Sequence, residues 1–197
     1  EIFLPFKIIK GIKKSNLSIH NLNAIIWYSP TIFFGPVVQF LKWSSKCPSY
    51  LILRDIFPEW TLDLGILKKS PIYYFFKIAA KYQYSVANVI GVQTYSNLKY
   101  LSSWSKKSNR KLEVLNNWIS YVDEKKTKIS IINTHLYKRK LFVYVGNMGV
   151  AQGMDIFIEL AESLKNKQDL GFIFVGRGSE VNKLKNFSIK KKLDNIL

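Results

Sequence analysis

The sequence has little of the side-chain chemistry on which metal proteins and many enzymes depend. Its 197 residues include one cysteine, Cys47, and only two histidines, His20 and His135. A single cysteine excludes an internal disulfide and supplies no zinc cluster, which favours a reducing compartment. Both histidines lie outside the sheet-end clusters described below. We therefore expect neither to act as a catalytic base, and we predict no metal site.

Acidic residues and long apolar runs are also scarce. Asp and Glu number 13 against 30 Lys and Arg, which gives a net charge of +17 and calls for an anionic partner: nucleic acid, an anionic membrane face or a phosphorylated ligand. No apolar run approaches the roughly 18 to 20 residues of a membrane-spanning helix, because the longest, 25–38, is broken by two prolines. With 48% hydrophobic residues, the chain is expected to bury a sizeable core.

The sequence is organised around residues 141–178. An apolar, β-branched and aromatic run at 141–145 is typical of a buried parallel strand, and a second run at 171–175 repeats the pattern. Between them, apolar residues recur at the spacing of one helix face: Met154, Phe157, Ile158, Ala161 and Leu164. We predict a strand, a glycine loop, a helix and a second strand, which together form one βαβ unit of a parallel sheet.

Such a unit can bind an anion at the loop that precedes its helix. Gly146, Gly149 and Gly153 allow the backbone to approach a ligand, and the first N–H groups of a helix point outward with the positive end of its dipole. A phosphate or diphosphate is the ligand that this chemistry favours. The loop matches neither G-x-G-x-x-G nor a Walker loop, so the alternative that these are ordinary turn glycines stays open.

The first 120 residues have the pattern of another α/β domain. Residues 1–23 form a basic amphipathic segment that either lies on a membrane surface or packs on its own domain. The polar, lysine-rich composition of residues 121–140 predicts a linker, and residues 141–197 are predicted to be the start of a second domain. Apolar periodicity predicts strands at 24–28, 49–53, 88–93 and 112–115, and helices at 33–43, 71–84 and 94–104. In the helix at 71–84, one apolar stripe comprises Phe75, Ile78, Ala79 and Tyr82.

A charged cluster follows the strand at 49–53. Arg54, Asp55 and Glu59 come directly after it, at the edge where open parallel sheets bind ligands. The structural alternative is a local ion pair and a helix that begins at Pro58-Glu59.

Five segments, in this order and spacing, resemble the glycosyltransferases of family 4, and most of all the branch that builds bacterial O-antigen and capsule polysaccharides. They are YSP (28–30), LRDIFPEWTLDLGIL (53–67), VLNNW (114–118), YVGNMGVAQGMD (144–155) and FVGRGSE (174–180). The resemblance implies the GT-B fold, an α/β architecture with two Rossmann-like parallel-sheet domains, the first binding the acceptor and the second a nucleotide-diphosphate sugar. It further implies retention of anomeric configuration without a metal ion or other cofactor.

The resemblance also assigns candidate residues. Asp55, with Arg54 beside it and Glu59 close by, would face the sugar from the acceptor domain, so these three are the candidate catalytic residues. The donor diphosphate would lie against the loop after 141–145, and the nucleotide would border the glycines after 171–175. The donor-binding candidates are Gly146, Asn147, Gly149, Gln152, Gly153, Gly176, Arg177 and Gly178.

The chain departs from the family pattern in three respects. Asn147 and Gln152 stand where many relatives have Arg and Lys, so diphosphate charge would be neutralised by backbone N–H groups, the helix dipole or Arg177. Arg54 stands where many have His. The first glycine-rich loop and the acidic donor motif would fall before residue 1 and after residue 197. We therefore expect a fragment with both domains incomplete, which alone has little or no activity.

The function expected of the intact enzyme is transfer of a sugar from a UDP-linked donor to a polyprenyl-diphosphate-linked acceptor at the cytoplasmic face of a bacterial membrane. The +17 charge would then serve binding to anionic lipid. Three alternatives stay open: a nucleotide-sugar 2-epimerase on the same fold, a membrane-surface module and a nucleic-acid-binding protein. Dispersed lysines and the lack of a nucleic-acid motif argue against the last. The donor sugar, the acceptor, the linkage and the oligomeric state are not encoded in any pattern found.

Overall fold

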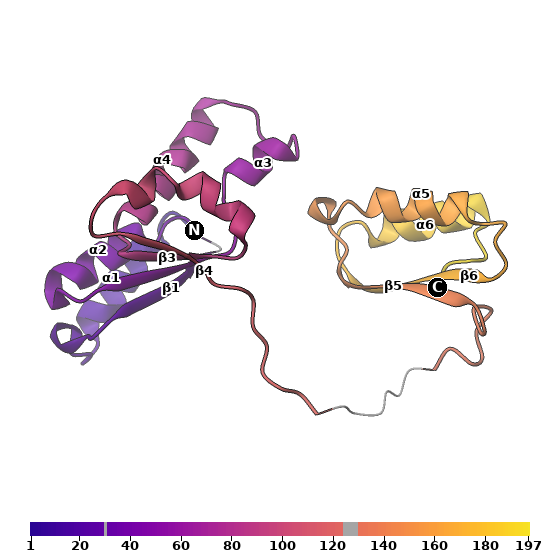
Figure 1. The fold of residues 1–197 in the computed structure, drawn as a ribbon, viewed down its shortest axis with the longest axis horizontal. Helices are drawn as coiled ribbons and strands as arrows, with labels where there is room; N and C mark the ends of the chain where they lie inside the picture. Colours follow the sequence, from indigo (N-terminus) through magenta and orange to yellow (C-terminus); the bar gives the residue numbers. More distant parts are fainter. Residues whose placement is uncertain (30, 124–129) are drawn as a thin grey trace. The chain divides into compact units, whose positions relative to one another are not determined.

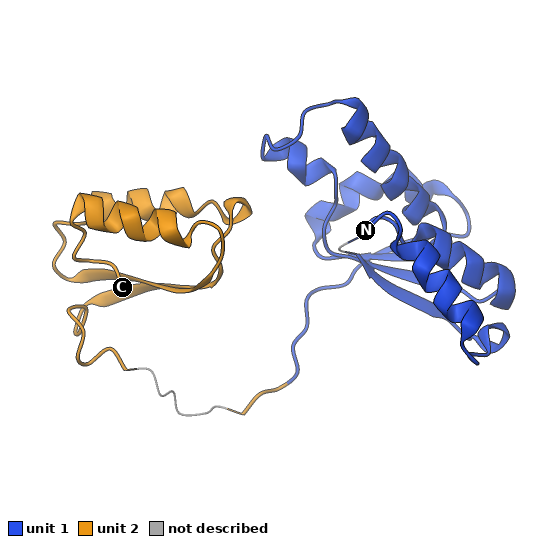
Figure 2. Ribbon diagram, turned by 180° about the vertical axis from the view of Figure 1, so that it is seen from behind, with its two compact units in different colours: residues 1–120 blue, residues 121–197 orange. Residues whose placement is uncertain are grey.

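The computed structural model describes residues 1–29, 31–123 and 130–197. These residues form two compact units, Glu1–Ser120 and Tyr121–Leu197, and each contains its own parallel sheet (Figures 1 and 2). Pro30 of the YSP segment and residues 124–129 of the predicted linker lie outside the described residues.

The sheet of unit 1 has four parallel strands in the order β1-β2-β3-β4. Each strand matches a predicted one within one or two residues: β1 (Ile25–Ser29), β2 (Ser49–Leu53), β3 (Val89–Val92) and β4 (Lys111–Val114). In the register, Leu51 of β2 lies opposite both Trp27 and Ile90. Because all four strands run the same way, their carboxyl ends share one edge of the sheet, where the segment after β2 begins.

The first strand is only half buried, which corrects the expectation of a buried strand at 24–28. Ile25 and Trp27 are buried, but Ile26 and Tyr28 on the opposite face are 67% and 50% exposed. Within the described residues β1 is an edge strand, and one of its faces is exposed. The interior strands behave differently, since Leu51, Ile90 and Val92 have no exposed area.

A side-chain bridge crosses the middle of this sheet. The Tyr50 hydroxyl on β2 donates to Oε1 of Glu113 on β4 (2.9 Å), passing over Gly91 of β3, where a Cβ would collide with that hydroxyl. Burial, with the Glu113 hydrogen bond, raises the pKa of Tyr50 to about 12. The bridge gives Gly91 a structural reason to be glycine.

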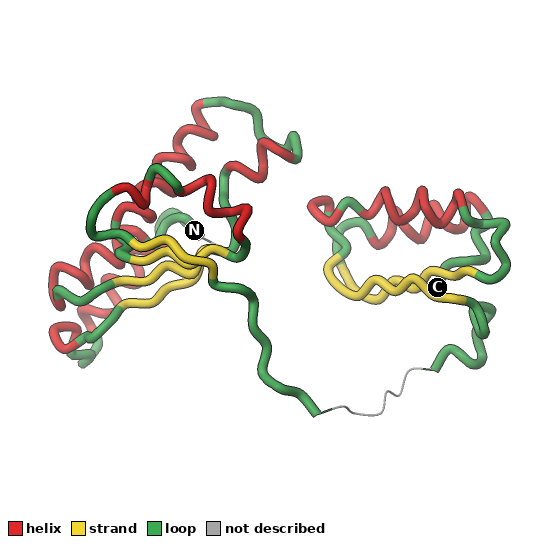
Figure 3. The backbone as a smooth tube through the Cα atoms, viewed as in Figure 1, coloured by secondary structure: helices red, strands yellow, loops and turns green. Residues whose placement is uncertain are grey.

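Helices and 3₁₀ segments connect these strands (Figure 3). Ser70 caps α4, since its Oγ accepts from the Tyr73 N–H (3.4 Å), and proline opens both α2 and α4. The predicted helix at 94–104 is wrong, because two 3₁₀ segments stand there. That stretch is rich in Ser, Asn and Tyr, which favour helices weakly. The Trp104 indole N–H also donates to the Tyr84 carbonyl (2.7 Å), which fixes the end of the stretch against α4. The elements are α1 (Leu4–Lys14), η1 (Ile19–Asn21), α2 (Gly35–Ser45), α3 (Glu59–Asp63), α4 (Pro71–Ser85), η2 (Tyr95–Leu101) and η3 (Trp104–Lys106).

The apolar stripe predicted on α4 is not the face that packs on the core. Tyr73, Ala80 and Tyr84 are buried, whereas Phe75 and Ile78 of the stripe are 48% and 68% exposed. The helix is apolar on more than one side, so sequence periodicity did not select its core face. The stripe residues line an apolar groove together with Pro5 and Phe6 of α1.

Unit 2 contains the predicted βαβ unit. Strands β5 (Lys140–Asn147) and β6 (Leu170–Arg177) pair in parallel, joined through η4 (Val150–Gln152) and α5 (Met154–Ser163), and α6 (Val181–Lys191) follows. Both α5 and α6 lie on the same side of the strands (Figures 1 and 3). The core of the unit lies between helices and strands and is formed by Met148, Met154, Ile158 and Leu184.

The other face of β5 is open, so the prediction of a fully buried strand is wrong here too. Val143 and Val145 are 58% and 73% exposed, because no described helix covers that side. Residues 195–197 pair in parallel with β6, as the start of a further strand would. The Phe172 N–H donates to the Asn195 carbonyl (2.7 Å), and the Leu197 N–H donates to the Phe172 carbonyl (2.9 Å).

We expect Ser70→Ala to destabilise unit 1 by about 1 kcal/mol, the usual cost of losing a helix cap. The N–H of Tyr73 would lose its side-chain acceptor at the start of α4. Urea denaturation monitored by circular dichroism measures the change. Ser102→Ala is the control, because that hydroxyl is exposed and bonds only the Lys99 carbonyl, three residues earlier in the preceding 3₁₀ segment. Equal losses in the two variants would contradict a capping role.

Candidate functional site

The loop that follows β5 has the geometry of an anion-binding turn. Strand β5 ends at Asn147, Met148 is buried, and a short 3₁₀ turn leads to Gly153 at the start of α5. Gly153 has a φ of 61°, in the left-handed region that glycine adopts without steric cost. A predicted donor-binding glycine therefore sets the direction in which α5 leaves the loop.

Only some N–H groups of this loop are available to a ligand. Oε1 of Gln152 accepts from the Gly149 N–H (3.1 Å) and from Nδ2 of Asn147 (3.0 Å). The N–H groups of Gln152 and Gly153 donate to backbone carbonyls within the turn. Among the described residues, no acceptor is found for four N–H groups, those of Val150, Ala151, Met154 and Asp155. Residues 149–154 therefore do not offer a continuous row of free N–H groups. The Gln152 side chain instead stabilises the loop by accepting two hydrogen bonds within it.

The charges around the start of α5 are nearly balanced. Asp155 lies in the first turn of the helix, and its Oδ1 pairs with Nζ of Lys183 (2.6 Å). That pairing reduces the repulsion that a carboxylate would exert on an anion in the loop. Arg177, at the end of β6, is exposed and has no ion pair in the part of the chain that the structure describes. Its guanidinium is therefore the nearest uncommitted cation on the neighbouring strand.

The glycines that follow β6 have a packing reason for being glycine. A Cβ on Gly176 would collide with the carbonyl oxygen of Gly146, and one on Gly178 with that of Met148. The Met148 N–H also donates to the Arg177 carbonyl (2.8 Å). The two loops are therefore bound together at the carboxyl ends of β5 and β6. A shallow depression lies there, lined by Val145, Gly146, Asn147, Val175, Gly176 and Arg177.

The charged cluster after β2 forms a second candidate pocket, in unit 1. Its volume is about 210 Å³, and Arg54, Asp55 and Glu59 all line it. Nη1 of Arg54 donates to the Leu115 carbonyl (2.7 Å), and its guanidinium stacks 5.0 Å from the Trp118 ring. The structure thus brings the three predicted residues together, but Arg54 is already committed to the chain after β4.

Three carboxylates line this pocket, those of Asp55, Glu59 and Asp63, and they differ in their contacts. Oε1 of Glu59 pairs with Nζ of Lys77 on α4 (3.4 Å), and a helix begins at Glu59 as the structural alternative predicted. The Lys77 pKa is raised, chiefly by its hydrogen bond with the Tyr73 hydroxyl and also by Glu59. Asp55 is exposed, and no ion pair or hydrogen bond of its carboxylate is found among the described residues. Asp55 is therefore free to meet a ligand, and so is Asp63, which is exposed and has no ion pair among the described residues.

The sequence analysis missed other residues that line this pocket. Asn97 and Tyr100 reach it from η2, the 3₁₀ segment that follows β3. They come soon after the carboxyl end of a parallel strand, so the rule that singled out Asp55 applies to them as well. Their polar side chains were assigned to a helix at 94–104, which hid that signal.

The two histidines have structural hydrogen bonds. A ring nitrogen of His20 donates to the Ser44 carbonyl (3.2 Å), and one of His135 donates to the Ile196 carbonyl (3.2 Å). Neither lines the pockets after β2 and β5. Within residues 1–29, 31–123 and 130–197, no three His, Cys, Asp or Glu side chains gather as a metal site, and no helix is long and apolar enough to cross a membrane. The carboxylate and histidine constellation that the 2-epimerase alternative needs is not formed by these residues.

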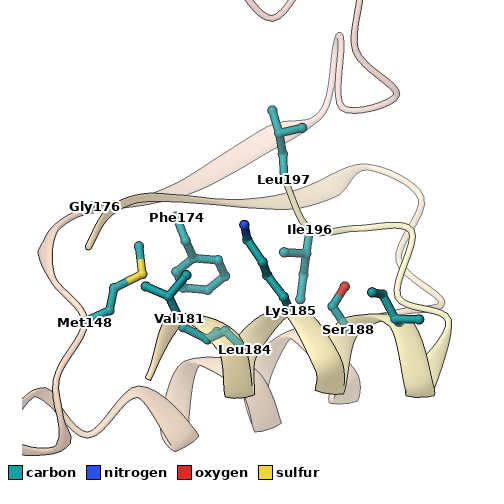
Figure 4. Close-up of a pocket in the computed structure, with 10 residues that line it drawn as sticks. Met148, Phe174, Gly176, Val181, Leu184, Lys185, Ser188, Ile196 and Leu197 are labelled. Atoms are coloured by element: carbon teal, nitrogen blue, oxygen red, sulfur yellow. The ribbon is translucent and has the colours of Figure 1, made fainter. Parts of the chain in front are cut away.

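Another pocket of unit 2, about 450 Å³, lies between β6, α6 and the last residues (Figure 4). Its walls are mainly apolar, including Phe174, Leu184 and Ile196, and the Lys185 ammonium rises between them in Figure 4. It offers one cation and no carboxylate. This lining suits apolar packing better than it suits a nucleotide diphosphate.

Comparison with known proteins shows which fold these features belong to. No protein-family model matches the chain. A probable glycosyltransferase of Pseudomonas aeruginosa, WbjE, is 26% identical over 148 residues, which are 71% of this chain and 36% of that protein.

Two solved structures have similar folds. A mutant of S. aureus TarM, determined with fondaparinux, α-GlcNAc-glycerol and UDP, gives a TM-score of 0.54 at 16% identity, over 87% of this chain and 32% of TarM. Phytolacca americana UGT2, determined with UDP-2fluoro-glucose and pterostilbene, gives 0.55 at 16% identity, over 98% of this chain and 52% of UGT2. The predicted α/β fold of GT-B type is thereby confirmed. The chain spans about a third to a half of the length of these proteins.

Proposed function

We propose that this chain is part of a glycosyltransferase that moves a sugar from a UDP-linked donor to a lipid-linked oligosaccharide in surface polysaccharide biosynthesis. The observation that carries the proposal is the β5–loop–α5 unit with its unpaired N–H groups, in a chain whose fold matches proteins determined with UDP and with a UDP-sugar analogue. Similarity to WbjE supports the same class of reaction. Membership of family 4 and of its O-antigen and capsule branch belongs to the proposal.

Unit 2 would bind the donor. We infer that the diphosphate lies against the loop 146–153, where it accepts from the free N–H groups of Val150, Ala151, Met154 and Asp155. As the bond between sugar and diphosphate breaks, negative charge grows on the departing diphosphate. Fixed N–H donors at a helix start and the Arg177 guanidinium would stabilise that charge without a metal ion.

Unit 1 would hold the acceptor and the reacting sugar. The exposed Asp55 carboxylate at the end of β2 would contact the sugar, where it opposes the positive charge that develops at the anomeric carbon. Arg54 would position the chain beside Asp55 through its hydrogen bond to the Leu115 carbonyl. Glu59 would act indirectly, through its ion pair with Lys77. Retention of anomeric configuration is part of the proposal.

A lipid-linked acceptor would bring the enzyme to the cytoplasmic face of the membrane. The surface of α1 supports this location, because the exposed Phe3 and Phe6 lie beside Lys7, Lys10 and Lys14. Next to them is the apolar groove between α1 and α4. Apolar side chains flanked by lysines favour the interface of an anionic membrane.

We expect the double variant Lys7→Gln/Lys10→Gln to bind phosphatidylglycerol vesicles roughly 10- to 30-fold more weakly, since each basic residue near anionic lipid contributes about 1 kcal/mol. Vesicle sedimentation at low and high salt measures the change, and added salt should weaken binding of the parent protein. The control is Lys165→Gln/Lys167→Gln, which removes the same charge from unit 2. Equal binding to neutral and anionic vesicles would refute the membrane part of the proposal.

A transfer assay tests the proposed function directly. The intact enzyme that contains this chain is incubated with UDP-sugars and a polyprenyl-diphosphate-linked saccharide, and products are separated by mass. Donor-dependent extension of the acceptor is the expected result. C2 epimerisation of a free nucleotide sugar, or tight nucleic-acid binding without affinity for UDP, would overturn the proposal in favour of one of the alternatives.

A further inference from the structure

A basic groove of unit 1 is not used by the proposed transfer chemistry. It has a volume of about 570 Å³ and runs between α4 and the 3₁₀ segments η2 and η3. Ile56, Glu59 and Tyr100 line both this groove and the pocket that holds Asp55. The groove is therefore continuous with the candidate site at the end of β2.

The groove gathers more positive charge than its own carboxylate can neutralise. Four cations line it, Lys77, Lys81, Lys107 and Arg110, against the single carboxylate of Glu59, which pairs with Lys77 (3.4 Å). Lys81 and Lys107 are exposed, and neither has an ion pair within the described residues. Like charges held close together repel one another unless an anion lies between them.

The arginine of the groove is held in place without any carboxylate. Its guanidinium stacks 5.0 Å from the Trp104 ring, and it donates to the carbonyls of Trp104 (3.3 Å) and Ser85 (3.4 Å). The Trp104 ring is fixed in turn by its indole bond to the Tyr84 carbonyl (2.7 Å). A fixed, planar guanidinium with uncommitted N–H donors is well suited to phosphate oxygens.

A buried hydroxyl of the same groove has no partner. Tyr84 lines the groove and is only 7% exposed, yet no described residue bonds its hydroxyl. Burial, together with the Glu59 carboxylate, raises the Tyr84 pKa, so the group remains an O–H donor at neutral pH. Buried polar groups are nearly always paired, and this unpaired donor belongs to a groove that four cations also line, so it points to a missing acceptor.

We propose that this groove binds a phosphate or diphosphate ester between Lys77, Lys81, Lys107 and Arg110, with the Tyr84 hydroxyl as a further donor. The inference rests on the proposed function in one respect: the diphosphate of a lipid-linked acceptor would then lie in the groove, with its sugar toward Asp55. The same chemistry would also suit a phospholipid headgroup.

The test measures binding of inorganic diphosphate by isothermal titration calorimetry in a Gly149→Asp background, where the loop of unit 2 carries an added negative charge. Binding should persist there, and Lys81→Gln/Lys107→Gln should weaken it at least about 10-fold. Lys165→Gln/Lys167→Gln, with the same loss of charge, should change it less than about 2-fold. Circular dichroism checks that each variant is folded.

Loss of diphosphate binding on Gly149→Asp alone, or equal weakening by the two lysine pairs, would overturn the inference. If instead the parent chain does not bind UDP while the groove still binds diphosphate, the proposed function is wrong and the inference that the groove binds an anion is upheld. Two further probes identify the source of the anion. Groove-dependent binding of farnesyl diphosphate points to the acceptor, and groove-dependent binding of phosphatidylglycerol vesicles alone points to a lipid headgroup.

Discussion

Replacing Gly149 by aspartate is expected to weaken UDP binding roughly 30- to 150-fold, because a new carboxylate beside the donor diphosphate would cost about 2 to 3 kcal/mol at the effective dielectric of a protein surface. Gly149 lies between the end of β5 and the free N–H groups of the turn. Its backbone is extended (φ −108°, ψ 173°), a conformation that any residue adopts. The change therefore adds charge without backbone strain.

Gly149→Asn is the matched control for this prediction. Both side chains begin with the same Cβ, which would meet the flexible ends of Gln152 (2.9 Å) and Asn147 (3.0 Å), so any steric cost is shared. Titration with UDP followed by calorimetry compares the two variants. If both lose affinity equally, the loss is steric and the electrostatic argument fails. If neither loses affinity, UDP does not bind at this loop.

In the intact enzyme, Asp55→Asn is expected to lower the rate of sugar transfer by roughly 100- to 1000-fold, the usual effect of removing one group that stabilises charge in a transition state. The carboxylate is exposed, without an ion pair or hydrogen bond among the described residues, so folding stability should change little. We expect kcat to fall while KM for the UDP-sugar stays within about 3-fold, since Asp55 lies in unit 1 and the donor loop in unit 2.

Comparison of Asp55→Asn with Arg54→Ala separates a direct effect on sugar transfer from an effect through structure. Arg54 holds the Leu115 carbonyl and stacks on Trp118, so its removal should reduce both stability and activity. The control for Asp55→Asn is Asp169→Asn, because it removes an exposed carboxylate from a turn of unit 2 outside both candidate pockets. Steady-state kinetics with urea denaturation of each variant gives both quantities. An Asp55→Asn enzyme with normal turnover would exclude Asp55 from the chemistry.

Much of the backbone arrangement was predictable because local patterns agree with it. Short apolar runs, rich in β-branched and aromatic residues, predicted the four strands of unit 1 and the two of unit 2 that the described residues form. Ser70-Pro71 marked the start of α4 through capping and the fixed φ of proline, whereas α2 begins at Gly35, two residues after the predicted start. The helix after Gly153 followed from the spacing of Met154, Ile158 and Ala161, which are buried as predicted.

The failures occurred where burial depends on distant parts of the chain. Val143 and Ile26 have the composition of buried strand residues, but whether a helix covers them is decided by packing across the sheet. The segment 94–104 has helical spacing, yet the bond from Trp104 to the Tyr84 carbonyl and weak helix propensity favour 3₁₀ turns. Periodicity reports which residues share a face and does not report what that face contacts.

The sequence by itself determined the parallel α/β elements, the glycine-marked loops at 146–153 and 176–178, and the excess of positive charge, because each depends on neighbouring residues or on composition alone. Only the tertiary structure decided which of those groups are free to act. It turned Gln152 onto the Gly149 N–H, tied Arg54 to Leu115 and Glu59 to Lys77, and left Asp55 without a partner. It also placed Lys81, Lys107, Arg110 and Tyr84 in the walls of one groove. Hydrogen bonds and charge contacts of this kind join residues far apart in the chain, and no local pattern specifies them.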